Sequence, residues 1–75
     1  MNAVNERMME SSALASMQRM LEKYASRHGI TFEAAMERYA DSDSYLALFD
    51  YETGLWGEGP DYLLAWFEAE CRQDT

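Results

Sequence analysis

Residues 24–36 read YASRHGITFEAAM, a stretch that predicts where a long first helix ends and a second helix begins. The tripeptide His-Gly-Ile at 28–30 is typical of a helix that stops at glycine, because glycine adopts the left-handed backbone conformation found at such ends. The apolar residue after the glycine usually folds back onto the helix, so we expect Ile30 to lie near Tyr24 or Ala25. The first helix is therefore expected to end here.

Upstream of this stop, residues 3–27 contain no glycine or proline, and apolar side chains recur at spacings of three and four residues. Such spacing places an apolar stripe on one side of a helix. The stripe and its neighbours are Met9, Ala13, Leu14, Met17, Met20, Leu21, Tyr24 and Ala25. We predict a helix from Ala3 to Arg27, in which the polar first ten residues fray.

Downstream of the stop, three shorter helices are predicted. Thr31 is a favourable N-cap for the second, the third is expected over residues 44–53, and Pro60 opens the fourth. Their apolar positions are Phe32, Ala35, Met36 and Tyr39, then Tyr45, Leu48 and Phe49, then Leu63, Leu64, Phe67 and Cys71. Between the third and fourth helices, Gly54 repeats the glycine stop, and Leu55 is expected to fold back toward Phe49.

These elements predict an all-α fold, a small bundle of one long N-terminal helix and three shorter helices. Seventy-five residues allow one domain, which we place over residues 1–75. No apolar run approaches the ~20 residues of a membrane span, and the N-terminus lacks a secretory pattern. We therefore expect a cytoplasmic protein that does not bind membranes.

The net charge of −8 is unevenly distributed along the chain. Residues 1–38 carry five acidic and five basic side chains, whereas residues 39–75 carry nine acidic side chains against Arg72 alone. Such a surface repels phosphate, so we expect no nucleic-acid binding. A basic protein is the complementary partner, and the alternative is that the acidity only keeps a small domain soluble.

Few residues in the chain could support catalysis or metal binding. The single histidine, His28, falls at a helix end, and the single cysteine, Cys71, falls on an apolar stripe, so a structural role fits each better than catalysis. Asp41, Asp43 and Glu52 echo the outer positions of a calcium loop, but the glycine needed at its turn is missing. We expect no enzyme activity, cofactor or metal.

Aromatic residues gather in the C-terminal half, where seven of the ten lie between Tyr45 and Phe67. A small helical hairpin cannot bury them all, so some are expected at the surface among carboxylates, as in many recognition sites. The predicted partner-binding residues are Tyr51, Trp56, Tyr62 and Trp66 with Asp50, Glu52 and Asp61. The alternative is that these aromatic side chains close the small core.

Residues 31–67 carry four short motifs: Phe-x-x-Ala-Met, Ser-x-x-Tyr-x-x-Leu, Glu-Thr-Gly-Leu-Trp and Pro-x-Tyr-Leu. The residues that form them are Phe32, Ala35, Met36, Ser42, Tyr45, Leu48, Glu52, Thr53, Gly54, Leu55, Trp56, Pro60, Tyr62 and Leu63. In these motifs the chain resembles a group of short, uncharacterised bacterial proteins, some of which look like members of gene clusters similar to toxin–antitoxin loci. The resemblance implies a partner-binding role in a bacterium.

Our leading hypothesis is a small acidic helical protein-interaction module, of which an antitoxin-like or accessory protein is one form. One alternative is a structural homo-oligomer built through the N-terminal helix, with Met9, Met17 and Met20 as the self-association residues. A second alternative is a regulator that binds a metal or another ligand through Asp41, Asp43 and Glu52.

Overall fold

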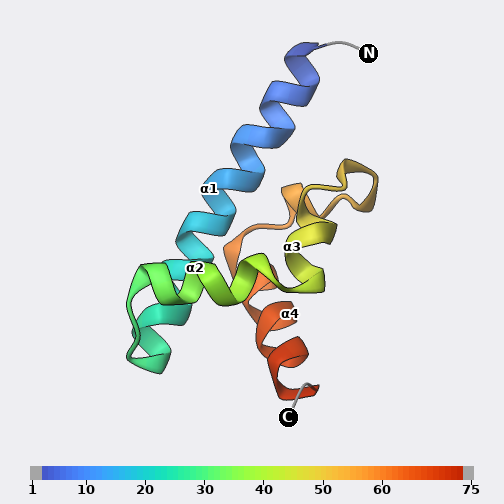
Figure 1. Cartoon of the computed structure of the whole chain (residues 1–75). Coiled ribbons are helices and arrows are strands. Elements are labelled where there is room, and N and C mark those ends of the chain that lie inside the picture. The colour runs from blue at the N-terminus through green and yellow to red at the C-terminus, as the bar shows by residue number, and fades with distance from the viewer. Residues whose placement is uncertain (1–2, 74–75) are drawn as a thin grey trace.

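The computed structural model describes residues 3–73, and the regular structure in this range is helical throughout. The elements are α1 (Ala3–His28), α2 (Phe32–Ala40), α3 (Asp43–Leu48), the 3₁₀ turns η1 (Tyr51–Thr53) and η2 (Leu55–Gly57), and α4 (Pro60–Gln73). Figure 1 shows α2 crossing the C-terminal half of α1, with α3 and the 3₁₀ turns beside the N-terminal half. Among these residues there is no strand, which confirms the all-α prediction. None of the described helices is long and apolar enough to cross a membrane.

The helix stop predicted at 28–30 is confirmed. Gly29 has φ +65°, and the Ile30 N–H donates to the Ala25 carbonyl oxygen at 3.0 Å while the Gly29 N–H donates to the Ser26 carbonyl oxygen at 3.4 Å. These two bonds form a Schellman motif, and Ile30 packs against the core as expected. The chain turns here so that α2 can cross α1.

The N-terminal part of α1 is helical from Ala3 onward, and the predicted fraying of the first ten residues stays a prediction. Residues 3–10 continue the helix, and Glu6 lies in its first turn, where a carboxylate suits the helix dipole. Residues 1–2 lie outside the described range. The predicted apolar stripe is mostly buried, but Leu14 is 45% exposed.

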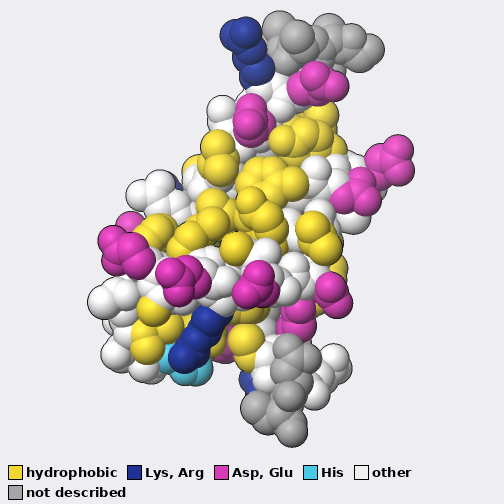
Figure 2. Space-filling model, viewed as in Figure 1, with side chains coloured by type: hydrophobic (Ala, Val, Ile, Leu, Met, Phe, Trp, Pro, Cys, Tyr) yellow, Lys and Arg dark blue, Asp and Glu magenta, His cyan; other side chains and the backbone are white. Residues whose placement is uncertain are grey.

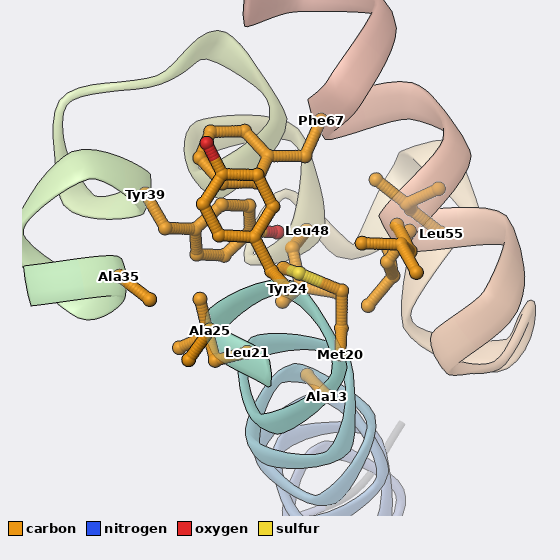
Figure 3. Close-up of a cluster of buried hydrophobic side chains, with 12 residues drawn as sticks. Ala13, Met20, Leu21, Tyr24, Ala25, Ala35, Tyr39, Leu48, Leu55 and Phe67 are labelled. Carbon is orange, nitrogen blue, oxygen red and sulfur yellow. The ribbon is translucent and has the colours of Figure 1, made fainter. Parts of the chain in front are cut away.

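A chain of aromatic rings joins the four helices. Tyr24 of α1 lies 4.7 Å from Phe67 of α4 between ring centroids, and Phe67 lies 5.0 Å from Tyr39 of α2. Tyr39 meets Tyr45 of α3 edge-on at 5.6 Å, and Tyr45 meets Phe49 at 5.3 Å. Figure 3 shows Tyr24, Tyr39 and Phe67 converging in the core. Such tilted and edge-on pairs add to the free energy gained by burying the rings.

The third helix is shorter than predicted, because α3 ends at Leu48 instead of continuing to residue 53. Asp50 is extended (φ −90°, ψ 96°), and its carboxylate accepts from the Glu52 N–H. The Thr53 hydroxyl donates to the Ala47 and Asp50 carbonyl oxygens and accepts from the Leu55 N–H. These side chains take hydrogen bonds that a continued helix would make, and so the chain forms two 3₁₀ turns.

Within these turns, Gly54 has the left-handed backbone conformation predicted for a glycine stop, and the apolar Leu55 follows it. Gly54 has φ +75°, and Leu55 is buried in the core. Trp56 packs partly buried against the same core. The loop between α3 and α4 is therefore held to the body by two apolar side chains.

The N-terminus of α3 is capped by a side chain from a different helix. The Glu70 carboxylate of α4 accepts from the Asp43 N–H at 2.6 Å and from the Ser44 N–H at 3.1 Å. Ser42 accepts from the Tyr45 N–H at 3.1 Å as the local N-cap. A six-residue helix is too short to be stable alone, so these caps fix α3 against α4.

Replacing Glu70 by alanine should lower the free energy of unfolding by about 1–2 kcal/mol, because two N–H groups at the start of α3 lose a charged acceptor. Urea denaturation followed by circular dichroism measures this change. Glu58→Ala is the control, since Glu58 is exposed. This variant should keep the free energy of unfolding within about 0.5 kcal/mol of the parent value. Equal midpoints for both variants would contradict the capping role.

Candidate interaction surface

Basic side chains of α1 are paired with acidic side chains of α4. Lys23 Nζ lies 2.5 Å from Asp61 Oδ1, and Arg27 Nη1 lies 2.8 Å from Glu68 Oε1. His28 Nε2 lies 3.4 Å from the second oxygen of Glu68. Lys23 also holds the pKa of the Asp61 carboxyl below its ordinary value, mainly through the hydrogen bond. Two basic residues of the N-terminal half therefore neutralise acidic residues of the C-terminal half.

A second group of acidic side chains has no such partner. We define the acidic rim as Glu6, Glu10, Glu33, Glu37, Asp50 and Glu52. All six are exposed, and none makes an ion pair with another residue in the range 3–73. Figure 2 shows acidic side chains at the top, at the right and in a row across the middle of one face, with the most prominent basic side chains near its upper and lower ends.

The centre of that face is apolar. Figure 2 shows hydrophobic side chains gathered above α2, over the N-terminal half of α1 and toward α3. We define the front surface as Leu14, Met17, Phe32, Met36, Tyr45 and Phe49, of which Leu14 and Phe32 are 45% and 38% exposed and the other four are partly buried.

On α1, Leu14 and Met17 lie two turns and one turn before Leu21 and so share its side of the helix. Figure 3 shows Leu21 and Ala25 beside Ala35 of α2. The side of α1 that α2 covers near its C-terminus therefore continues uncovered at Leu14 and Met17. Glu10, one turn before Leu14, lies on the same side.

On α2, Met36 and Arg38 project from opposite flanks, because two residues turn a helix by about 200°. Arg38 Nη1 donates to the Tyr24 hydroxyl at 3.3 Å, so its flank faces the C-terminal part of α1. The opposite flank, with Phe32 and Met36 one turn apart, faces the N-terminal half of α1.

Tyr45 of α3 contacts Tyr39 of α2 and Phe49, the residue that directly follows α3. Tyr45 and Phe49 therefore continue the aromatic contacts from α2 to the end of α3. Helices α1, α2 and α3 each contribute one flank to the front surface.

The residues predicted to bind a partner fall into two places. Asp50, Tyr51 and Glu52 form the start of η1, and Tyr51 lines a recess of about 360 Å³ with Glu6, Arg7 and Glu10. This group adjoins the front surface, because Glu10 shares the side of α1 that carries Leu14.

The remaining predicted residues lie elsewhere. Trp56 packs partly buried against the core, and Asp61 is paired with Lys23. Tyr62 and Trp66 lie one turn apart on the outer side of α4, 53% and 37% exposed. Asp50 and Glu52 therefore adjoin the front surface, whereas the exposed rings of α4 form a separate patch.

Sequence reasoning missed Leu14, Met17, Phe32 and Met36 as candidate site residues. It assigned them to apolar stripes. Leu14 lies on the same side of α1 as the buried Leu21, so helical spacing gave no signal that Leu14 would be exposed.

The predicted self-association residues are placed differently from one another. Met20 is fully buried in the core of its own chain, so its side chain cannot contact a second copy in this structure, and its inclusion is corrected here. Met9 and Met17 are partly buried. These methionines are buried to different extents because other elements of the same chain pack against one side of α1.

The calcium interpretation is not supported by the geometry. Asp43 begins α3 and Glu52 lies in η1 beyond its other end, so the helix separates them. Residues 3–73 contain no group of three or more His, Cys, Asp or Glu side chains placed to hold a metal ion.

His28 and Cys71 line the same open cleft of about 440 Å³, together with Tyr24, Arg27, Glu68 and Arg72. The two side chains have different hydrogen-bond partners, although both lie near Tyr24. The Tyr24 hydroxyl lies 3.8 Å from Cys71 Sγ, whereas His28 contacts Glu68 and its ring stacks 4.2 Å from the Tyr24 ring. These contacts tie α1 to α4.

No protein-family model, curated protein or solved structure matches the chain. The resemblance to short bacterial proteins therefore stays a prediction, and the surface itself is the evidence for function.

Two buried tyrosines make stability depend on alkaline pH. Burial is the largest cause that raises the pKa of Tyr39 above its ordinary value of 10.0, and the hydrogen bond with Ser44 at 3.2 Å partly opposes it. Burial likewise raises the pKa of Tyr24. The folded state thus favours the neutral phenols, so this contribution is complete below pH 10 and is lost as pH rises through the folded-state pKa.

We expect the free energy of unfolding to fall above pH 10 in the parent and to fall less steeply in Tyr39→Phe, which cannot ionise there. The variant should also lose about 1 kcal/mol at neutral pH with the Ser44 hydrogen bond. Urea denaturation at several pH values between 8 and 11 measures both effects, with Tyr62→Phe as the exposed control. Parallel pH profiles for the parent and Tyr39→Phe would refute the assignment.

Proposed function

We propose that this protein is a small acidic helical interaction module that binds a basic segment of a protein partner on the front surface, without chemistry of its own. The observation that carries this proposal is the front surface itself, an apolar area from three helices that is bordered by exposed carboxylates. An antitoxin-like or accessory protein of the cytoplasm is the form of this role that the sequence resemblance favours.

The two parts of the surface have different roles in binding. Apolar and aromatic side chains supply most of the affinity when a partner removes them from water. The rim steers a positively charged partner toward the surface and disfavours acidic partners, nucleic acids included. The acidic residues thus select a partner that the apolar side chains then hold.

Solubility alone does not explain this arrangement. Acidic residues that only keep a protein in solution need no particular neighbours, whereas Glu10 lies one turn before the exposed Leu14 and Glu33 directly follows the exposed Phe32. The basic residues Lys23 and Arg27 are meanwhile used at the contact of α1 with α4. The front surface is left with negative charge and apolar area together.

Removing two rim charges should weaken binding to basic peptides. We expect Glu33→Gln with Glu37→Gln to reduce binding about 2- to 30-fold, since each exposed charge contributes ~0.2–1 kcal/mol. The probe is an array of basic and acidic peptides with equal apolar content, read at about 50 mM and about 300 mM NaCl, where screening weakens the interaction. The parent should prefer the basic set.

The matched control is Glu22→Gln with Glu58→Gln, which makes the same change in net charge. Glu22 lines a recess with Lys23 and Arg27 and so lies away from the rim. This control should bind like the parent apart from a small uniform effect of net charge. Equal losses in both double variants, or no preference for basic peptides, would overturn the proposal.

A further inference from the structure

The shape and charge pattern of the front surface restrict the form of a partner segment. The surface lies between α1 on one side and α3 with η1 on the other, and α2 closes its lower end. Rim carboxylates stand on both sides, Glu6 and Glu10 on α1 and Asp50 and Glu52 at η1. The recess lined by Glu6, Arg7, Glu10 and Tyr51 lies between these sides, so one basic side chain stands among the carboxylates there.

From this pattern, and resting on the proposed function, we propose that the partner segment is an amphipathic α-helix with an apolar stripe and basic residues on both flanks. Its stripe packs on Leu14, Met17 and Phe49, and its two flanks meet the carboxylates of α1 and η1. A helix presents this arrangement of one apolar stripe between two charged flanks.

The dimensions fit a helix of about three turns. The side of α1 that carries the rim and the apolar side chains runs from Glu6 to Met17, which at 1.5 Å per residue is about 16 Å. An amphipathic helix of about 11 residues has the same length. A segment of this size presents three or four apolar side chains on one stripe.

An extended segment fits this surface less well. Residues 3–73 form no strand, so the described part of the chain offers no sheet edge whose backbone groups could pair with an extended partner. A helix satisfies its own backbone hydrogen bonds and needs only side-chain contacts. The flexible side chains of Met17 and Met36 adapt readily to such a stripe.

A second copy of this chain is the wrong occupant on grounds of charge. Two front surfaces placed face to face bring the rim of one copy against the rim of the other, and like charges in contact disfavour association. A basic helix instead places opposite charges along both sides. Charge complementarity therefore favours a foreign basic helix.

Three synthetic 14-residue peptides test this inference by titration calorimetry against the full chain. The first has seven leucines at helical spacing and seven lysines, the second has the same composition with leucine and lysine alternating, and the third has the helical spacing with glutamate for lysine. We expect the first to bind at least tenfold more tightly than the second and to gain helical circular dichroism on binding. The third should not bind.

The outcomes separate the two levels of the proposal. Equal affinity of the two lysine peptides overturns the helical partner and leaves the basic-partner function standing. Failure of both lysine peptides, or equal binding of the glutamate peptide, overturns both. A dimer in sedimentation that the first peptide dissociates overturns the foreign helix in favour of a second copy.

Two matched variants locate the bound peptide. Leu14→Gln changes a partly exposed front-surface side chain without touching the buried core, and we expect it to weaken binding of the first peptide at least fivefold. Tyr62→Gln changes the exposed ring on α4 and should leave affinity within twofold. Equal effects of the two variants, or a larger loss with Tyr62→Gln, contradict binding at the front surface.

Discussion

The contact between Phe67 and Tyr39 is the constraint on which the rest of the structure depends. Phe67 brings α4 against Tyr24 of α1, and Tyr39 brings α2 against Tyr45 of α3, so this one pair links the two halves of the aromatic chain. Both rings are almost fully buried. In a chain of 75 residues the apolar core is small, and a few large rings supply much of its buried area.

The position of the front surface follows from that core. Because Tyr39 and Ala35 face inward, Met36 and Arg38 must point along the two flanks of α2. Arg38 reaches the Tyr24 hydroxyl on one flank, which leaves Met36 on the other beside the uncovered part of α1. The apolar surface is therefore a consequence of where α2 crosses α1.

Local signals in the sequence predicted the helices well and the surface poorly. The stop at Gly29 and the cap at Thr31 depend on residues within a few positions of one another, and the structure confirms both. The predicted end of the third helix was wrong. The side chains of Asp50 and Thr53 compete with the helix for backbone hydrogen bonds, so α3 ends earlier. The cap from Glu70 and the exposure of Leu14 depend on contacts between distant segments, which spacing along the chain does not reveal.

The distribution of charge along the sequence also differs from the distribution of unpaired charge in the folded chain. Counting along the sequence places the whole excess of negative charge in residues 39–75. In the folded chain, however, Lys23 and Arg27 pair with Asp61 and Glu68, so basic residues of the balanced half neutralise acidic residues of the other. Four acidic residues of the balanced half, Glu6, Glu10, Glu33 and Glu37, remain exposed and outside these ion pairs, and Arg7 lines the same recess as Glu6 and Glu10. Folding thus cancels two acidic side chains of the C-terminal half and leaves Glu10 and Glu33 of the other half exposed near apolar side chains of α1 and α2. The proposed basic amphipathic partner rests on this combination of exposed carboxylates and apolar area.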